Sequence, residues 1–101
     1  MRMTTPVLKV VAALLADPTA QTYGLQLMQA TGLPSGTLYP VLIRLERAGW
    51  VTSQWEQTDP AAEGRPARRY YTLTADGAQQ ARREVAAMQQ QISHIGKAQT
   101  A

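Results

Sequence analysis

Five arginines stand in two short segments of the chain, where they could bind a polyanion. Arg44 and Arg47 lie in SGTLYPVLIRLERAG, and Arg65, Arg68 and Arg69 lie in GRPARR. A guanidinium presents a planar fork of donors that fits a phosphate or the edge of a guanine. The net charge of +3 permits a nucleic-acid partner without requiring one. These residues are therefore candidate contacts with double-stranded DNA.

Other kinds of chemistry have few residues to support them. The chain has no cysteine, which excludes disulfides, thiolate zinc sites and cysteine nucleophiles. With a single histidine, His94, neither a histidine metal cluster nor a histidine-based catalytic triad is expected. The 7 acidic residues are scattered along the chain. We therefore expect no enzyme activity, no metal site and no cofactor.

The first arginine pair belongs to an expected helix over 35–48. Apolar residues recur there every three or four positions, as on one buried helical face: Leu38, Val41, Leu42 and Leu45. Gly49 is expected to follow the C-cap. The opposite side of the helical wheel carries Gly36, Pro40, Ile43 and Arg47, flanked by Tyr39 and Arg44.

Pro40 is unusual inside such a helix. An interior proline removes a backbone donor and clashes with the carbonyl four residues earlier, which costs about 3 kcal/mol or more. If the helix begins at Ser35 or Gly36, only the bond to the Gly36 carbonyl is lost, and Gly36 has no side chain to resist a backbone shift. A rigid helix start suits a surface that meets DNA, since its free N–H groups favour phosphate. The DNA contacts expected from this helix are Ser35, Gly36, Thr37, Tyr39, Pro40, Arg44 and Arg47.

The remaining elements follow from periodicity and capping residues. The other expected helices cover 5–16, 23–30 and 75–95, with Thr5, Thr22 and Thr74 as their N-caps. The expected strands cover 50–57 and 68–74, joined by a loop over 58–67. This order predicts a mainly α fold with a small antiparallel β-hairpin, which is a winged helix-turn-helix followed by a C-terminal helix.

The hairpin then forms the wing, and 35–48 is the recognition helix for the major groove. Arg65 lies between Gly64 and Pro66 in the wing loop 58–67, where it could enter a narrow minor groove or contact the backbone. Alternation along the following strand sends Arg68 and Arg69 to opposite faces, and we assign the phosphate contact to Arg68.

The last helix carries an apolar stripe at heptad spacing: Ala78, Ala81, Val85, Met88, Ile92 and Ile95. Such a stripe could simply cover the protein's own core. Because it is narrow and long for a chain of this size, we favour a partner helix from a second subunit. The predicted dimer interface contains Ala81, Val85, Met88, Ile92 and Ile95.

Two motifs together resemble the PadR family of bacterial transcriptional regulators. They are SGTLYPVLIRLERAGWV and GRPARRYYTLTADG, and the resemblance is firm over roughly 22–77. It implies a dimeric winged-helix repressor with a single C-terminal dimerisation helix, as in the shorter subfamily. Members of that family often respond to small aromatic ligands and others act without one, so the resemblance leaves an effector open; the candidate pocket residues are Trp50 and Trp55.

The length of 101 residues fits one domain, with the winged helix-turn-helix over 5–74, the dimerisation helix over 75–95 and a flexible tail over 96–101. The longest apolar run, Val10 to Ala16, is too short to span a bilayer, so we expect a cytoplasmic protein. The alternative function is a winged-helix module that binds proteins and no specific DNA. A gel shift at two salt concentrations would separate these two functions.

Overall fold

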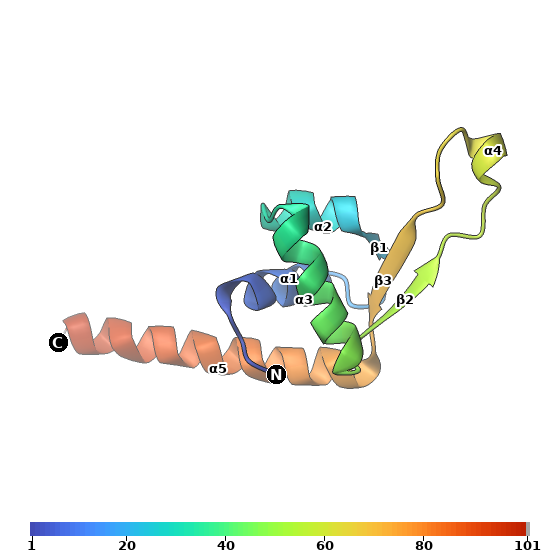
Figure 1. Ribbon diagram of the computed structural model, residues 1–101. Coiled ribbons are helices and arrows are strands. Elements are labelled where there is room, and N and C mark those ends of the chain that lie inside the picture. Colours follow the sequence, from blue (N-terminus) through green and yellow to red (C-terminus); the bar gives the residue numbers. More distant parts are fainter. Residues whose placement is uncertain (101) are drawn as a thin grey trace.

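The computed structural model describes the backbone of residues 1–100 and the side chains of residues 1–96. In chain order, the elements are α1 (Thr5–Leu15), β1 (Thr22–Tyr23), α2 (Gly24–Thr31), α3 (Ser35–Arg47), β2 (Val51–Trp55), α4 (Pro60–Glu63), β3 (Arg69–Leu73) and α5 (Ala75–Thr100). This arrangement confirms the expected mainly α fold with a small antiparallel sheet (Figure 1). No helix within residues 1–100 is both long and apolar enough to cross a membrane.

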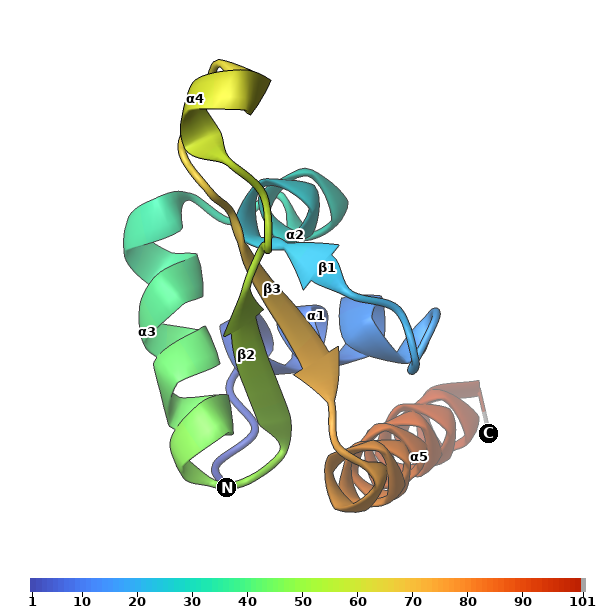
Figure 2. The ribbon, with the colours of Figure 1, turned by 90° about the vertical axis from the view of Figure 1, so that its right-hand side faces the viewer.

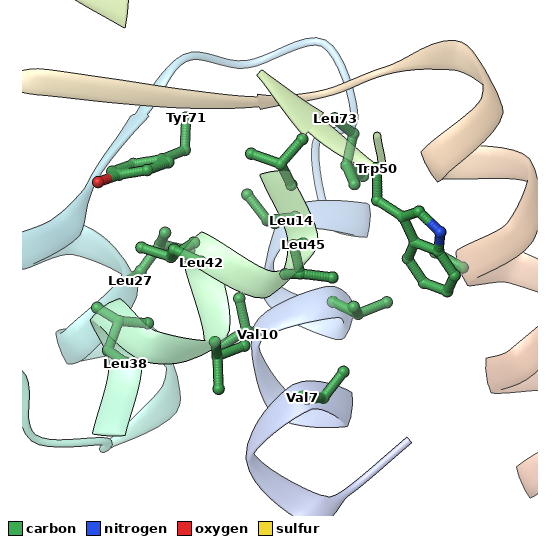
Figure 3. Close-up of a cluster of buried hydrophobic side chains, with 14 of the residues drawn as sticks. Val7, Val10, Leu14, Leu27, Leu38, Leu42, Leu45, Trp50, Tyr71 and Leu73 are labelled. Atoms are coloured by element: carbon green, nitrogen blue, oxygen red, sulfur yellow. The ribbon is translucent and has the colours of Figure 1, made fainter. Parts of the chain in front are cut away.

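Four helices, α1, α2, α3 and the first part of α5, build the core with one face of the sheet. Apolar side chains from α1, α2, α3 and the strands converge on a single cluster (Figure 3). The periodicity of α3 is confirmed, since its four buried residues are Leu38, Val41, Leu42 and Leu45. Gly49 follows the helix with a φ of 78°, a left-handed conformation that favours glycine.

Two of the expected helix caps are wrong by one residue. Thr4, not Thr5, caps α1, because its hydroxyl accepts a hydrogen bond from the Val7 N–H at 3.4 Å. Tyr23, not Thr22, precedes α2, and its backbone N–H donates to Gln26 at 2.9 Å. Thr22 instead pairs in β1. The expected cap Thr74 is confirmed, since its hydroxyl accepts from the Gly77 N–H at 2.9 Å.

The sheet has three strands rather than two. Its order is β1-β3-β2, with both pairings antiparallel. Tyr23 of β1 pairs with Tyr70, so the start of α2 is tied to the hairpin. The hairpin strands are shorter than expected, and Figure 2 shows the hairpin beside α3 with α4 beyond the strand ends.

The wing loop 58–67 contains one helical turn, α4. The Asp59 carboxylate accepts a hydrogen bond from the Ala61 N–H at 3.0 Å, and Pro60 occupies the first helical position. Gly64 ends the turn with a φ of 69°. The Asp59-Pro60 pair therefore begins a helical turn and Gly64 ends it, where the composition of the segment had indicated a loop without regular structure.

The helix α5 divides into a packed half and a projecting half. Ala78 and Ala81 belong to the core, and Val85 packs against it. Ile92 and Ile95 are 62% and 56% exposed, where the helix extends past the rest of the protein (Figure 1). Ala81 was predicted at the dimer interface, but it is fully buried by its own chain, because α5 packs there against the core.

The last helix extends beyond its expected end at residue 95, whereas the flexibility of the tail over 96–101 stays a prediction. The helix α5 continues to Thr100, and residue 101 lies outside the described residues. No proline follows Ile95, and a single glycine within a helix costs only about 1 kcal/mol relative to alanine. The segment therefore contains no strong signal for ending the helix.

A glycine allows the start of α5 to lie directly against the backbone of Trp50, the residue before β2. A Cβ atom added at Gly77 would lie 2.6 Å from the Trp50 Cα, which no real side chain tolerates. The Trp50 side chain itself is 3% exposed and part of the core (Figure 3). Trp50 is therefore a packing residue in this structure, and its place in a ligand pocket stays a prediction.

Candidate nucleic-acid interface

The outward face of α3 carries most of the predicted DNA contacts. Ser35 is the first residue of α3, so Pro40 lies inside the helix, just after its first turn. A Cβ added at Gly36 would meet nothing within 4 Å, which leaves room for the backbone to adjust around Pro40. Thr37 is partly buried, and the exposed residues of this face are Ser35, Gly36, Tyr39, Pro40, Ile43, Arg44 and Arg47.

Arg44 and Arg47 keep their charges available. Among the side chains that the structure describes, no carboxylate forms an ion pair with either residue. The neighbouring Glu46 turns the other way and accepts a hydrogen bond from Ser53 of β2. Two unpaired guanidiniums therefore project from the C-terminal half of α3, with no protein anion to compete for them.

Tyr39 lies against the start of α2 and remains 41% exposed. A Cβ added at Gly24 would come within 2.9 Å of the Tyr39 ring carbon that bears the hydroxyl. Glycine at this position thus makes space for the Tyr39 ring. The two helices of the helix-turn-helix meet at this contact, which fixes where the Tyr39 hydroxyl is presented.

Arg65, predicted to reach the minor groove, holds a carboxylate in this structure. Its Nη1 and Nη2 donate to the two Glu56 oxygens at 2.6 and 3.2 Å. The Glu56 side chain is only 8% exposed. The hydrogen bond from Arg65 lowers the pKa of Glu56 from 4.5 to about 2, so this carboxylate is ionised at neutral pH.

Two tyrosines share the same carboxylate. The hydroxyls of Tyr23 and Tyr70 each lie 3.3 Å from Glu56 Oε2 and 2.7 Å from one another. Their rings stack with centroids 4.4 Å apart. The hydrogen bond with Tyr23 raises the pKa of Tyr70 to about 12. We call Glu56, Arg65, Tyr23 and Tyr70 the wing-base cluster.

Arg68 and Arg69 leave the hairpin on different sides, as alternation predicts. The Arg68 guanidinium lies 4.7 Å from the centre of the Tyr23 ring, and Arg68 is exposed. Arg69 donates to the Ser53 hydroxyl at 2.7 and 3.0 Å and lies over the Trp55 ring. A long ion pair of 3.8 Å joins Arg69 to Glu46. Arg69 therefore links the hairpin to α3.

A hollow of about 380 Å³ lies between the start of α2, α3 and the hairpin. Trp55, the second tryptophan predicted for a ligand pocket, lines it and is 61% exposed. Trp50 lies elsewhere, in the core, so the two tryptophans do not share a cavity.

No group of three histidine, aspartate or glutamate side chains in the described part of the chain could hold a metal ion.

Sequence reasoning missed Glu56 and Tyr23. Glu56 follows β2 directly and Arg65 precedes β3, so a hairpin drawn with both residues near its open end would have suggested their pairing. Tyr23 offered no comparable signal. Its place in the cluster depends on a two-residue strand that pairs with a segment 47 residues away.

Known proteins share this architecture. A PadR-like transcription factor from Bacteroides fragilis is 20% identical, with a TM-score of 0.72, over 92% of this chain and 91% of that chain. The Streptococcus mutans protein smu.1704 is 26% identical, with a TM-score of 0.70, over 96% and 94% of the two chains. A PadR family regulator from Eggerthella lenta is 24% identical, with a TM-score of 0.73, over 92% and 83%.

The family assignment comes from the sequence itself. No curated protein matches the chain. The sequence profile of the transcriptional regulator PadR-like family matches residues 13–83, which is more than half of the chain. Regulators of this family are not enzymes, in agreement with the scattered acidic residues and the single histidine. The chain therefore belongs to the PadR-like family of transcriptional regulators.

Proposed function

We propose that this regulator is a dimeric repressor that binds a specific DNA sequence through α3 and the wing. The observation that carries the proposal is the pair of exposed arginines on α3, Arg44 and Arg47, which no carboxylate in the described residues neutralises. Unpaired guanidiniums on a convex helix suit the major groove, where arginine can hold a guanine edge with two hydrogen bonds. Arg44 is the residue proposed to read the base.

The start of α3 supplies contacts of a different kind. Ser35, Gly36 and Pro40 are exposed in its first turns, where backbone N–H groups favour a phosphate. Tyr39 presents a hydroxyl beside them. Contacts of these residues with phosphates would not distinguish one base from another, but they would set the position of the helix in the groove.

In the wing, Arg68 is the proposed phosphate contact, because it is exposed and forms no ion pair over residues 1–96. Arg65 could enter the minor groove only after its ion pair with Glu56 is broken. The Glu56 carboxylate, whose side chain is 8% exposed, would then have no positive partner. The minor-groove contact of Arg65 therefore stays a prediction that requires the wing-base cluster to open.

The proposed dimer uses the projecting half of α5. Met88, Ile92 and Ile95 continue the heptad stripe beyond the core, and two isoleucines more than half exposed on one stripe are a liability for a lone helix. A second copy of α5 would cover them. It would also hold two recognition helices for half-sites about 34–36 Å apart.

DNA binding is tested with the DNA upstream of the protein's own gene, by gel shift at two salt concentrations. We expect retardation that is selective over a shuffled duplex and weaker at the higher salt, because phosphate contacts release counterions. Absence of any retardation at low salt would contradict DNA binding and favour the alternative, a protein-interaction module. A promoter fused to a reporter then tests repression.

The dimer is tested by sedimentation of the wild type and of Ile92→Asp. We expect a wild-type dimer at micromolar concentration, and a monomer for the variant because the substitution places a charge in the apolar seam. Gln90→Asp is the matched control, since Gln90 is exposed on the opposite side of the same helix. A monomeric wild type, or a dimer unchanged by Ile92→Asp, would contradict the proposed interface.

A small aromatic effector is supported only by the hollow that Trp55 lines. Because Trp50 is buried and Trp55 is exposed, a ligand in this hollow should quench the Trp55 part of the fluorescence. Quenching that persists in Trp55→Leu would place such a ligand elsewhere.

A further inference from the structure

The wing-base cluster joins the wing to the helix-turn-helix through one carboxylate. Glu56 accepts hydrogen bonds on both oxygens: Oε1 from Arg65 at 2.6 Å and from Thr58 at 3.2 Å, and Oε2 from Arg65 at 3.2 Å. The Tyr23 and Tyr70 hydroxyls, each 3.3 Å from Oε2, complete its surroundings. A carboxylate with this many donors has little capacity left and fixes the groups around it.

Tyr23 makes the cluster more than a feature of the hairpin. This residue belongs to β1 and is also the N-cap of α2, so its ring is attached to the helix-turn-helix. Glu56 and Arg65 belong to the wing. The cluster therefore sets where the wing lies relative to the helices that meet the DNA.

Arg68 is held by the face of the Tyr23 ring instead of by an acid. Its guanidinium lies 4.7 Å from the ring centre, a cation–π geometry. Such a contact orients the side chain and leaves its hydrogen-bond donors free for a phosphate. A carboxylate partner would have neutralised the same charge.

We propose that Arg65 is a positioning residue, which pairs with Glu56 to hold Tyr23 and Tyr70 in place and thereby presents Arg68 to a DNA phosphate. The proposal rests on the DNA binding proposed above and assigns Arg65 and Arg68 different parts in it. It replaces a direct minor-groove contact of Arg65 with an indirect one. Tyr23 and Glu56 become determinants of wing placement that no DNA atom needs to touch.

The experiment is a double-mutant cycle with Arg65→Ala and Arg68→Ala, measured by fluorescence anisotropy on the duplex found by gel shift. Arg68→Ala should weaken binding several-fold and lower the slope of log affinity against log salt by about one unit. Arg65→Ala should weaken binding in the same direction. The double variant should be no weaker than Arg68→Ala alone, because Arg65 acts through Arg68.

The Glu56→Gln variant distinguishes a direct DNA contact of Arg65 from a positioning role, because the two predict opposite changes in DNA affinity. This change removes a negative charge from the wing and frees Arg65. If Arg65 contacts DNA itself, affinity should rise. If Arg65 positions Arg68, affinity should fall, and the loss should vanish when Arg68 is already alanine. Circular dichroism of each variant checks that the protein remains folded.

Three outcomes would overturn the proposal. Additive losses with a salt slope lowered by about two units would make Arg65 a second phosphate contact. Tighter binding by Glu56→Gln would make Glu56 a brake on Arg65. A wild type that binds no DNA would contradict both this inference and the proposed function, whereas the first two outcomes leave DNA binding intact.

Discussion

The recognition helix and the wing carry the same residue type in opposite circumstances. On α3, Arg44 and Arg47 are exposed and have no ion-pair partner among the described side chains. In the wing, Arg65 holds Glu56, Arg69 holds Ser53 and lies over Trp55, and Arg68 lies over Tyr23. The helix therefore leaves its two arginines unpaired, while in the wing two of the three hold other side chains of the protein.

The difference has a physical origin. A helix of 13 residues packed on a core is rigid without help from its surface charges. A hairpin that extends from the protein has few apolar contacts, and a two-stranded ribbon is marginal alone. Side-chain links such as the Glu56–Arg65 pair therefore have to fix its orientation. Counting arginines in a sequence does not distinguish these two uses.

The largest expected effect is on the helix side of this comparison. Arg44→Ala should weaken binding to the specific duplex by about 1–3 kcal/mol if Arg44 reads a guanine. Binding to a shuffled duplex should change much less. The measurement is anisotropy on both duplexes, with Arg83→Ala of α5 as a matched exposed, helical control. Unchanged specific affinity would remove Arg44 from the DNA surface.

A paired test of Arg47 and Arg69 compares the two regions directly. Arg47→Ala should lower the salt slope of binding by about one unit, because this arginine is free to contact a phosphate. Arg69→Ala should leave the slope unchanged, since Arg69 is already engaged by Ser53 and Glu46. Equal slopes for the two variants would show that the pairing seen in the wing does not decide which arginine meets DNA.

A smaller effect is expected where α3 meets α2. Gly24→Ala should displace the Tyr39 ring, because the new Cβ would lie within 2.9 Å of it. The free end of a side chain can move, so the thermal midpoint should change little while DNA affinity falls by a few-fold. In a Tyr39→Ala background the same glycine change should have no effect on affinity. A loss that persists there would mean that Gly24 acts by another route.

The smallest expected effect is the acid response of the wing. The Arg65 hydrogen bond lowers the pKa of Glu56 from 4.5 to about 2. The stabilisation from this carboxylate is therefore fully present above about pH 4.5 and is lost as the pH falls toward 2. The thermal midpoint of the wild type should exceed that of Glu56→Gln at pH 6, and the difference should shrink between pH 4.5 and pH 2.5. A difference independent of pH would exclude ionised Glu56 as its source.

Local patterns were sufficient to find the main helices and the buried face of α3, but not the exact caps, the short α4 or the end of α5. The 3.6-residue period of α3 identified its four buried residues and, by subtraction, its exposed face, because both follow from the geometry of one helix. The hairpin could also be predicted, since alternation and turn residues are properties of adjacent segments. The predicted DNA contacts on α3 are exposed for the same reason, apart from the partly buried Thr37.

For the apolar stripe on α5, the local pattern did not show which residues the protein's own core covers. Its heptad spacing was correct as a pattern, but the same spacing serves the core at Ala81 and leaves Ile92 exposed. Which half is buried depends on how far α1 and the sheet extend along the helix. Likewise Trp50 and Trp55 are alike in the sequence, and only the packing of α5 on Trp50 makes one a core residue.

The sequence by itself determined the winged-helix architecture, the face of α3 and the family, because these depend on local periodicity and on motifs within short segments. Only the tertiary structure decided what the wing arginines do. Tyr23 and Tyr70 are 47 residues apart, and Glu56 meets both only because β1 pairs with β3. A two-residue strand has no period to detect, and hydrogen bonds to one carboxylate are decided by which chain segments pack together.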